Sequence, residues 1–237
     1  MGQLKKNSEI KASAREYLLG NYVRVISVQF LFLFFSWGIS TVWSAIPGTG
    51  TGVMILTGAL TFFSYVLIQV LIFGLSRMYL KLCCRMNYGM SDLFGGLRDN
   101  RVVLSALLLA ALQFVFTFPA DVLVLLSLRS SDPSLATISL AARIVGMLTY
   151  YVVWLFFSQL YYVLLDFPDK GVGDCIKISF WLMKGQKLKL VGIQLSFLPL
   201  ILLSILTVGV GMIWVTPYMN ASYACFHLNL TEAKSAG

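Results

Sequence analysis

Two long runs without a formally charged side chain constrain this chain more than any other feature. Val25 to Ser76 form a run of 52 residues without Asp, Glu, Lys or Arg, and Leu190 to Leu230 form another of 41. Since about 20 apolar residues cross the hydrocarbon core of a bilayer, both runs predict membrane-spanning structure. The composition agrees, because 12% of the 237 residues are charged, whereas soluble domains average about 25%.

Each run is too long for a single span. As one helix, Val25 to Ser76 would measure about 78 Å, far more than the roughly 30 Å of hydrocarbon. Pro47 to Gly52 and Thr207 to Gly211 carry the residues that break helices. We therefore expect an all-α, polytopic transmembrane helical bundle of about six spans, at Val23–Ile46, Val53–Leu80, Arg101 to about Pro119, Ile144–Leu165, Leu190–Leu206 and Met212–Phe226. A five-span chain, with one long fifth helix and an external tail, is the alternative.

The distribution of positive charge predicts the orientation. Of the 18 lysines and arginines, all but Arg129 and Arg143 fall near the two termini or at the second-to-third and fourth-to-fifth connections. Cytoplasmic segments of membrane proteins are enriched in Lys and Arg. We therefore expect a plasma-membrane protein with both termini in the cytoplasm. The net charge of +8 then reflects orientation, and nucleic acid is not an expected partner.

The cytoplasmic segments also suggest an internal repeat within a single membrane domain, residues 1–237. Gly20 to Val25, before the first span, resembles Gly185 to Leu190, before the fifth. Each cytoplasmic segment is expected to form an amphipathic helix that leads into a hairpin of two spans. The sequence therefore predicts three two-helix hairpins, with possible repeats at residues 10–90, 91–170 and 171–237.

Residues that enzymes use are scarce. His227 is the only histidine, which excludes the usual His-based zinc sites. The four cysteines lack zinc-ligand spacing, and no zinc-protease, nucleophile-elbow or phosphate-loop motif occurs. We expect no enzymatic activity, no cofactor and no metal.

Each expected span contains a side-chain amide. An amide that faces lipid without a partner costs several kcal/mol, so these groups should point inward and hydrogen-bond between helices: Gln29, Gln69, Gln113, Gln159, Gln194 and Asn220. Three of them each precede a polar residue at the inner end of a span by seven or eight positions, namely Gln69, Gln159 and Asn220. These three are also candidates for a polar path or substrate site at one depth.

Charged side chains supply the other candidate sites. Asp121 and Arg143 could form an outer charge pair that binds a ligand, or could lie in a solvated loop. Two cytoplasmic basic clusters are candidates for contacts with anionic lipids, where each charge contributes about 1 kcal/mol. Simple anchoring and an acidic partner are the alternatives. The clusters are Arg77, Lys81 and Arg85, spaced by four, and Lys184, Lys187 and Lys189.

Several segments resemble one protein family. They are Arg15–Asn21, Gly74–Tyr79, Ser91–Phe94, Met183–Lys189 and Thr207–Tyr223. Together they resemble the bacterial membrane proteins classified as domain of unknown function 975. The resemblance implies a multi-span chain and brings no established activity. It departs after the third span, where Phe118-Pro-Ala-Asp121 stands in place of a Pro-Gly turn.

Two classes of function remain open at this point. The leading hypothesis is a non-enzymatic transport or lipid-handling component of the membrane, and transport would need a cavity at the layer of amides. The alternative is a membrane interaction or envelope-assembly factor without a transport path. That alternative would need an exposed apolar helix face for a protein partner.

Overall fold

The computed structural model describes residues 5–44, 50–127, 133–207 and 209–235, and these residues form helices and turns with no strand. The all-α prediction is confirmed. The helices are α1 (Asn7–Leu18), α2 (Tyr22–Ser44), α3 (Thr51–Cys83), α4 (Ser91–Phe94), the 3-10 helix η1 (Gly95–Arg98), α5 (Asn100–Ser127), α6 (Pro133–Phe157), α7 (Leu160–Asp166), α8 (Val172–Met183), α9 (Lys187–Leu195), α10 (Leu198–Leu206) and α11 (Met212–Ser235).

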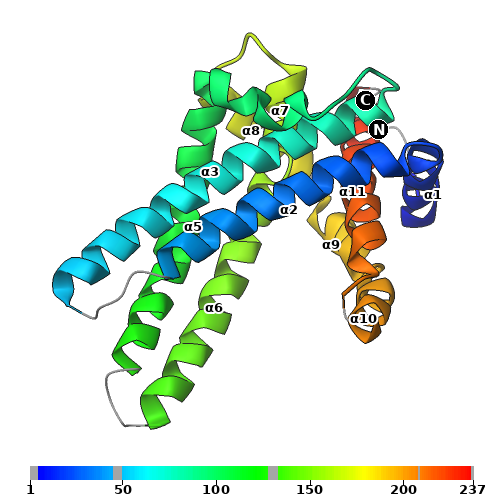
Figure 1. The fold of residues 1–237 in the computed structure, drawn as a ribbon. Coiled ribbons are helices and arrows are strands. Elements are labelled where there is room, and N and C mark those ends of the chain that lie inside the picture. The colour runs from blue at the N-terminus through cyan, green and yellow to red at the C-terminus, as the bar shows by residue number, and fades with distance from the viewer. Residues whose placement is uncertain (1–4, 45–49, 128–132, 208, 236–237) are drawn as a thin grey trace.

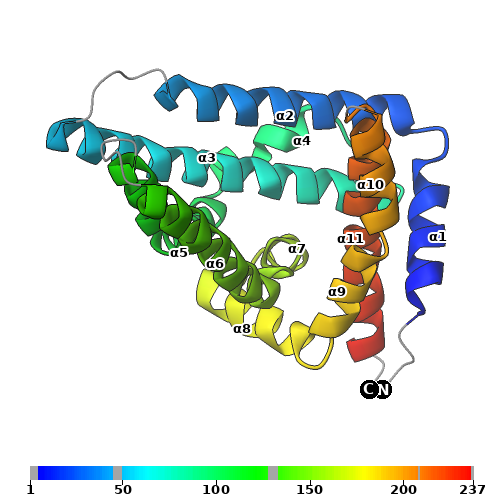
Figure 2. The ribbon, with the colours of Figure 1, turned by 90° about the horizontal axis from the view of Figure 1, so that it is seen from below.

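The long helices lie in neighbouring pairs that spread apart from a common base. Helix α2 lies along α3, α5 along α6, and α10 beside α11 (Figures 1 and 2). The far ends of these pairs diverge, whereas α1, α7 and α8 cover the region where the pairs meet. The first and last described segments lie next to each other, and the Lys5 backbone N–H donates to Asn229 Oδ1 at 3.0 Å.

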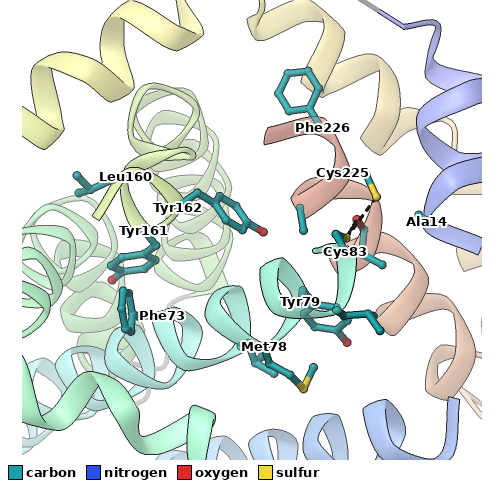
Figure 3. Packing of buried hydrophobic residues seen from close by; sticks show 14 of the residues in the cluster. Ala14, Phe73, Met78, Tyr79, Cys83, Leu160, Tyr161, Tyr162, Cys225 and Phe226 are labelled. Atoms are coloured by element: carbon teal, nitrogen blue, oxygen red, sulfur yellow. Dashed lines mark hydrogen bonds between the residues drawn. The ribbon is translucent and has the colours of Figure 1, made fainter. Parts of the chain in front are cut away.

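The apolar core is concentrated at the base. Ile10, Ala14 and Leu18 recur every four residues along α1 and are all buried, which gives this helix the apolar stripe of an amphipathic helix. Helix α1 packs mainly on α11. Figure 3 shows part of this core, to which α3, α7 and α11 contribute buried side chains, among them Tyr79, Tyr162 and Phe226.

Within the described part of the chain, five helical stretches are long and apolar enough to cross a membrane: Tyr22–Ile39, Thr51–Cys83, Asn100–Val124, Ser134–Asp166 and Lys187–Leu206. Helix α11, expected as the sixth span, is long but more polar and is not among them. Six spans therefore remain a prediction. A single helix through Thr207 to Gly211 is wrong, because α10 ends at Leu206 and α11 begins at Met212, with Gly209 between them at φ +84°.

Three predicted boundaries were wrong by about two helical turns or more. Helix α5 continues through Pro119 to Ser127, so Asp121 lies in a helix. Helix α6 begins at Pro133, well before Ile144, and α11 continues past Phe226 to Ser235. Helix α2 ends at Ser44, and α3 begins at Thr51 within the break expected at Pro47 to Gly52, of which the first three residues lie outside the described part of the chain.

Two of the expected spans are interrupted. The fourth breaks at Ser158 and Gln159, between α6 and α7, and the fifth breaks at Ser196 and Phe197, between α9 and α10. At the second break, Lys11 of α1 donates from Nζ to the Ser196 carbonyl at 3.2 Å and to its hydroxyl at 3.1 Å. Charge-assisted hydrogen bonds of this kind satisfy carbonyl groups that an interrupted helix leaves free.

The proposed repeat has a local counterpart in the structure. Gly20 follows α1 at φ +80° and Gly185 follows α8 at φ +76°, so both amphipathic helices end in the left-handed turn that favours glycine. Each is followed directly by another helix, α2 or α9. The threefold repeat itself stays a prediction.

Candidate functional site

The only histidine of the chain lies at the centre of a buried polar group. His227 of α11 is fully buried, and its Nε2 lies 2.8 Å from Oδ2 of Asp166, at the end of α7. Its Nδ1 lies 3.0 Å from Oε1 of Gln159, in the break between α6 and α7. The Tyr162 ring stacks on the imidazole at 4.9 Å between centroids. Both ring nitrogens are thus engaged within the protein, and the group ties α11 to α7.

A second polar group surrounds Gln69 of α3. Its amide nitrogen lies 3.4 Å from Oε1 of Gln113 in α5 and 3.3 Å from the Tyr150 hydroxyl in α6. Its carbonyl oxygen accepts from the Tyr161 hydroxyl at 3.0 Å. Helices α3, α5, α6 and α7 therefore meet at one amide.

A third group joins α2, α3 and α11. The carbonyl oxygen of Gln29 accepts from the Tyr79 hydroxyl at 3.1 Å and from the Asn220 amide at 3.2 Å. In the same way, Gln194 of α9 accepts from the Tyr151 hydroxyl of α6. The expected amides all make contacts of the kind that hold helices together in membranes.

The structure does not bring the three predicted path residues together. Gln69, Gln159 and Asn220 lie in three different groups, and no hydrogen bond among the described residues joins one group to another. The sequence could not separate these groups, because their tyrosine and histidine partners come from other helices. A transport path through these three amides stays a prediction.

Two of the predicted lipid contacts have an internal partner instead. Arg77 Nε lies 3.2 Å and Lys81 Nζ lies 2.6 Å from Oδ1 of Asp92, whose side chain is buried. The backbone N–H of Gly89 donates to the other carboxylate oxygen at 3.0 Å. This carboxylate fixes α4 against the end of α3, and a contact of Arg77 or Lys81 with lipid stays a prediction.

The remaining basic candidates lie in different surroundings. Arg85 Nη2 lies 3.3 Å from Oε1 of Glu16 in an exposed pair. Lys187 Nζ lies 3.0 Å from the centre of the Phe156 ring. Lys184 is exposed and Lys189 is half-buried. In the second basic cluster, Lys187 therefore contacts an aromatic ring, whereas Lys184 and Lys189 are fully or partly exposed at the surface.

The outer charge pair does form. Arg143 Nη2 of α6 lies 3.6 Å from Oδ1 of Asp121 in α5, and both side chains are partly exposed. Because α5 and α6 extend further than the sequence predicted, this pair links two helices and does not lie in a loop. Its position explains a contact between α5 and α6, and its role in ligand binding stays a prediction.

The described residues contain no group of three or more His, Cys, Asp or Glu side chains that could hold a metal ion. All four cysteines are free thiols. Cys83 and Cys225 lie together in the core, with their sulfur atoms 3.4 Å apart (Figure 3).

These features define a helical chain whose described residues include five helical stretches long and apolar enough to cross a membrane, held together by buried amide, tyrosine and histidine contacts. The family described as "Protein of unknown function (DUF975)" matches residues 1–234, so the chain belongs to this family. The resemblance found in the sequence is confirmed. No curated protein and no solved structure matches the chain.

Proposed function

We propose that this chain is a multi-span plasma-membrane protein that holds phospholipid between its diverging helix pairs, without covalent chemistry. The observation that carries this proposal is the exposure of α6. Within the apolar stretch Ser134–Asp166, 6% of the most apolar 18-residue window is buried, whereas α7 at the end of the stretch is largely buried. Leaving so much apolar surface in water is unfavourable by about 25 cal/mol per Å², whereas acyl chains would cover it.

Exposed apolar side chains also occur on the helix pair across from α6. Helix α10 presents Leu202, Leu203, Ile205 and Leu206 at its surface. In Figure 1 the far ends of α6 and α10 point away from the shared base. Lipid chains between these helices would contact both of them while the base stays closed.

The orientation follows from the positive-inside bias. Lys5 and Asn229, near the two ends of the described chain, are in contact at the base, and most basic residues lie in the terminal segments or in the connections at this end of the molecule. Since cytoplasmic segments collect Lys and Arg, we place the base at the cytoplasmic side. The diverging ends then extend toward the outer leaflet.

Lipid handling is favoured over solute transport by the polar groups. Each amide of the expected path already has a hydrogen-bond partner inside the protein. A solute would have to displace these contacts, whereas acyl chains need only the apolar surfaces that are already exposed.

The same exposed face supports one other candidate function. If α6 binds a protein in the membrane, the chain would act as an interaction or envelope-assembly factor. Its apolar side chains at Ile144, Leu148 and Val152, spaced by four, would then form the contact.

Photo-crosslinking distinguishes these functions. Benzoylphenylalanine is introduced at Leu148 of α6 or at Leu203 of α10, and the full-length protein is purified in detergent until bulk lipid is removed. We expect phospholipid adducts at both positions, detected as mass additions, and none at the buried control Phe226. Detergent adducts alone would overturn the proposal. Adducts to another protein at Leu148 in intact cells would favour the assembly factor.

A further inference from the structure

The end of α3 adopts a backbone conformation that is unusual for its residue. The Met86 N–H donates to the Lys81 carbonyl at 2.9 Å and the Arg85 N–H to the Leu82 carbonyl at 3.1 Å, which is the Schellman pattern of helix ends. The left-handed residue in this pattern is usually glycine, but here Arg85 occupies it at φ +55°. It is the one non-glycine residue with positive φ among those described. Strained non-glycine residues of this kind are often found at functional sites, so the Arg85 side chain is a candidate for ligand binding.

Arg85 lines a polar pocket of about 370 Å³, the α1–α3 pocket, between the end of α1, the start of α2 and the loop after α3. Figure 1 shows the end of α3 beside these two segments. Glu16, Tyr17, Arg24 and Tyr88 also line it. All of these residues belong to the base of the molecule.

The two arginines of the pocket are each held over an aromatic ring. The guanidinium carbon of Arg24 lies 5.4 Å from the centre of the Tyr88 ring, and that of Arg85 lies 5.7 Å from the centre of the Tyr17 ring. Such stacking fixes the planes of guanidinium groups and leaves their N–H groups free to bind anions. Glu16 balances one of the two charges through its contact with Arg85, so one positive charge is left over.

Tyr88 adds an unused hydrogen-bonding group. Its hydroxyl is buried and has no hydrogen-bond partner among the described residues. Burial raises the pKa of this hydroxyl, against the opposite effect of Arg24, so it stays protonated and can donate. A buried hydroxyl without a partner is unfavourable, and a ligand oxygen would satisfy it.

The edge of the pocket is apolar and open. Leu19 and Met86 both line the pocket and are largely exposed, and Val23, in the first turn of α2, is 82% exposed. Helix α2 continues from here as a strongly apolar stretch. A ligand with an anionic group and an apolar chain would therefore place the anionic group in the pocket and its chain along the apolar surface of α2.

We propose that the α1–α3 pocket binds the phosphate of an anionic phospholipid from the cytoplasmic leaflet, with Arg24 and Arg85 as charged donors and Tyr88 as a neutral donor. The phosphate neutralises the remaining positive charge of the pocket. This inference rests on the proposed function, because it requires the base to face the cytoplasm, and it adds the lipid class and the site.

Binding is measured by native mass spectrometry on the full-length protein in detergent, titrated with phosphatidylglycerol or phosphatidylcholine. We expect tighter binding of phosphatidylglycerol. The double variant Arg24→Gln/Arg85→Gln should weaken it about tenfold or more, since each arginine contributes through charge and hydrogen bonds. The matched control Arg98→Gln removes an exposed arginine outside the pocket and should change the affinity less than about twofold.

The variant Tyr88→Phe tests phosphatidylglycerol binding to the pocket without an expected effect on folding. It deletes a hydroxyl that has no partner in the protein, so the melting temperature should not fall, while phosphatidylglycerol binding should weaken about fivefold. Equal affinity in wild type, Tyr88→Phe and the double arginine variant would overturn the pocket assignment.

A third arm identifies the source of the phosphate. Inorganic phosphate at millimolar concentration should leave phosphatidylglycerol binding unchanged, and binding of inorganic phosphate without phosphatidylglycerol would overturn the lipid assignment. If the pocket variants bind normally but lipid adducts still form at Leu148, this inference fails and the proposed function stands. If phosphatidylglycerol does not bind and no adducts form, both fail.

Discussion

The Nε2 atom of His227 lies 2.8 Å from Oδ2 of Asp166, which joins the buried side of α11 to the exposed end of α7. We expect His227→Leu to destabilise the protein by about 2–4 kcal/mol, because it removes both imidazole contacts and leaves the buried Gln159 amide without this partner. Asp166→Asn keeps an acceptor for the imidazole and should cost less than about 1 kcal/mol. Thermal unfolding in detergent measures both. Equal losses in the two variants would contradict this arrangement.

The Gln69 amide gives a second stability test. Gln69→Leu leaves the buried Tyr161 hydroxyl without its acceptor, so we expect a loss of about 1–2 kcal/mol. Adding Tyr161→Phe should recover part of that loss, since the unpaired hydroxyl is then gone. A double-mutant cycle on unfolding free energies measures the coupling. Strictly additive losses would show that the two groups do not interact.

Gly74 tests how closely α4 approaches α3. A Cβ atom added at Gly74 would overlap the Leu93 carbonyl oxygen, and a backbone atom cannot move aside without shifting the chain. We expect Gly74→Ala to destabilise the protein by about 1–3 kcal/mol or to prevent its folding. The control is Gly38→Ala in α2, where a Cβ would meet nothing within 4 Å. A Gly74→Ala protein as stable as this control would show that α4 lies elsewhere.

The thiol pair offers a direct distance test. The sulfur atoms of Cys83 and Cys225 lie 3.4 Å apart, and only a small shift brings them to the roughly 2.05 Å of a disulfide. We expect a thiol oxidant such as copper phenanthroline to join these two cysteines within one chain. Peptide mapping after alkylation identifies the bond. A disulfide that pairs the exposed Cys84 in higher yield would contradict the packing of α3 on α11.

Charge-free runs predict the long helices well, because lipid-facing segments need apolar side chains whatever their neighbours are. Helix α3 and the break between α10 and α11 were predictable for this reason. The end of α5 was not, because Pro119 usually signals a helix boundary and here the helix continues through it. Tertiary contacts with α6 hold that segment in the helix.

The contacts of the candidate site, like the helices, were predictable from the sequence only in part. The sequence indicated that the amides point inward, since an unpaired amide in lipid is costly. It could not indicate that Asp92 would bind both Arg77 and Lys81, because that contact depends on how α4 folds back on α3. Nor could it single out Arg24, whose role depends on a pocket built from three separate segments.

Lipid handling and the phosphate pocket both require the base of the molecule to face the cytoplasm. The most direct measurement is labelling of single cysteines, introduced into a cysteine-free full-length protein, with a membrane-impermeant maleimide in intact cells. Thr51→Cys, at the start of α3, should react in intact cells, whereas Lys184→Cys, at the base, should react only after permeabilisation. Reaction of Lys184→Cys in intact cells, with Thr51→Cys protected until permeabilisation, would contradict the orientation on which both proposals depend.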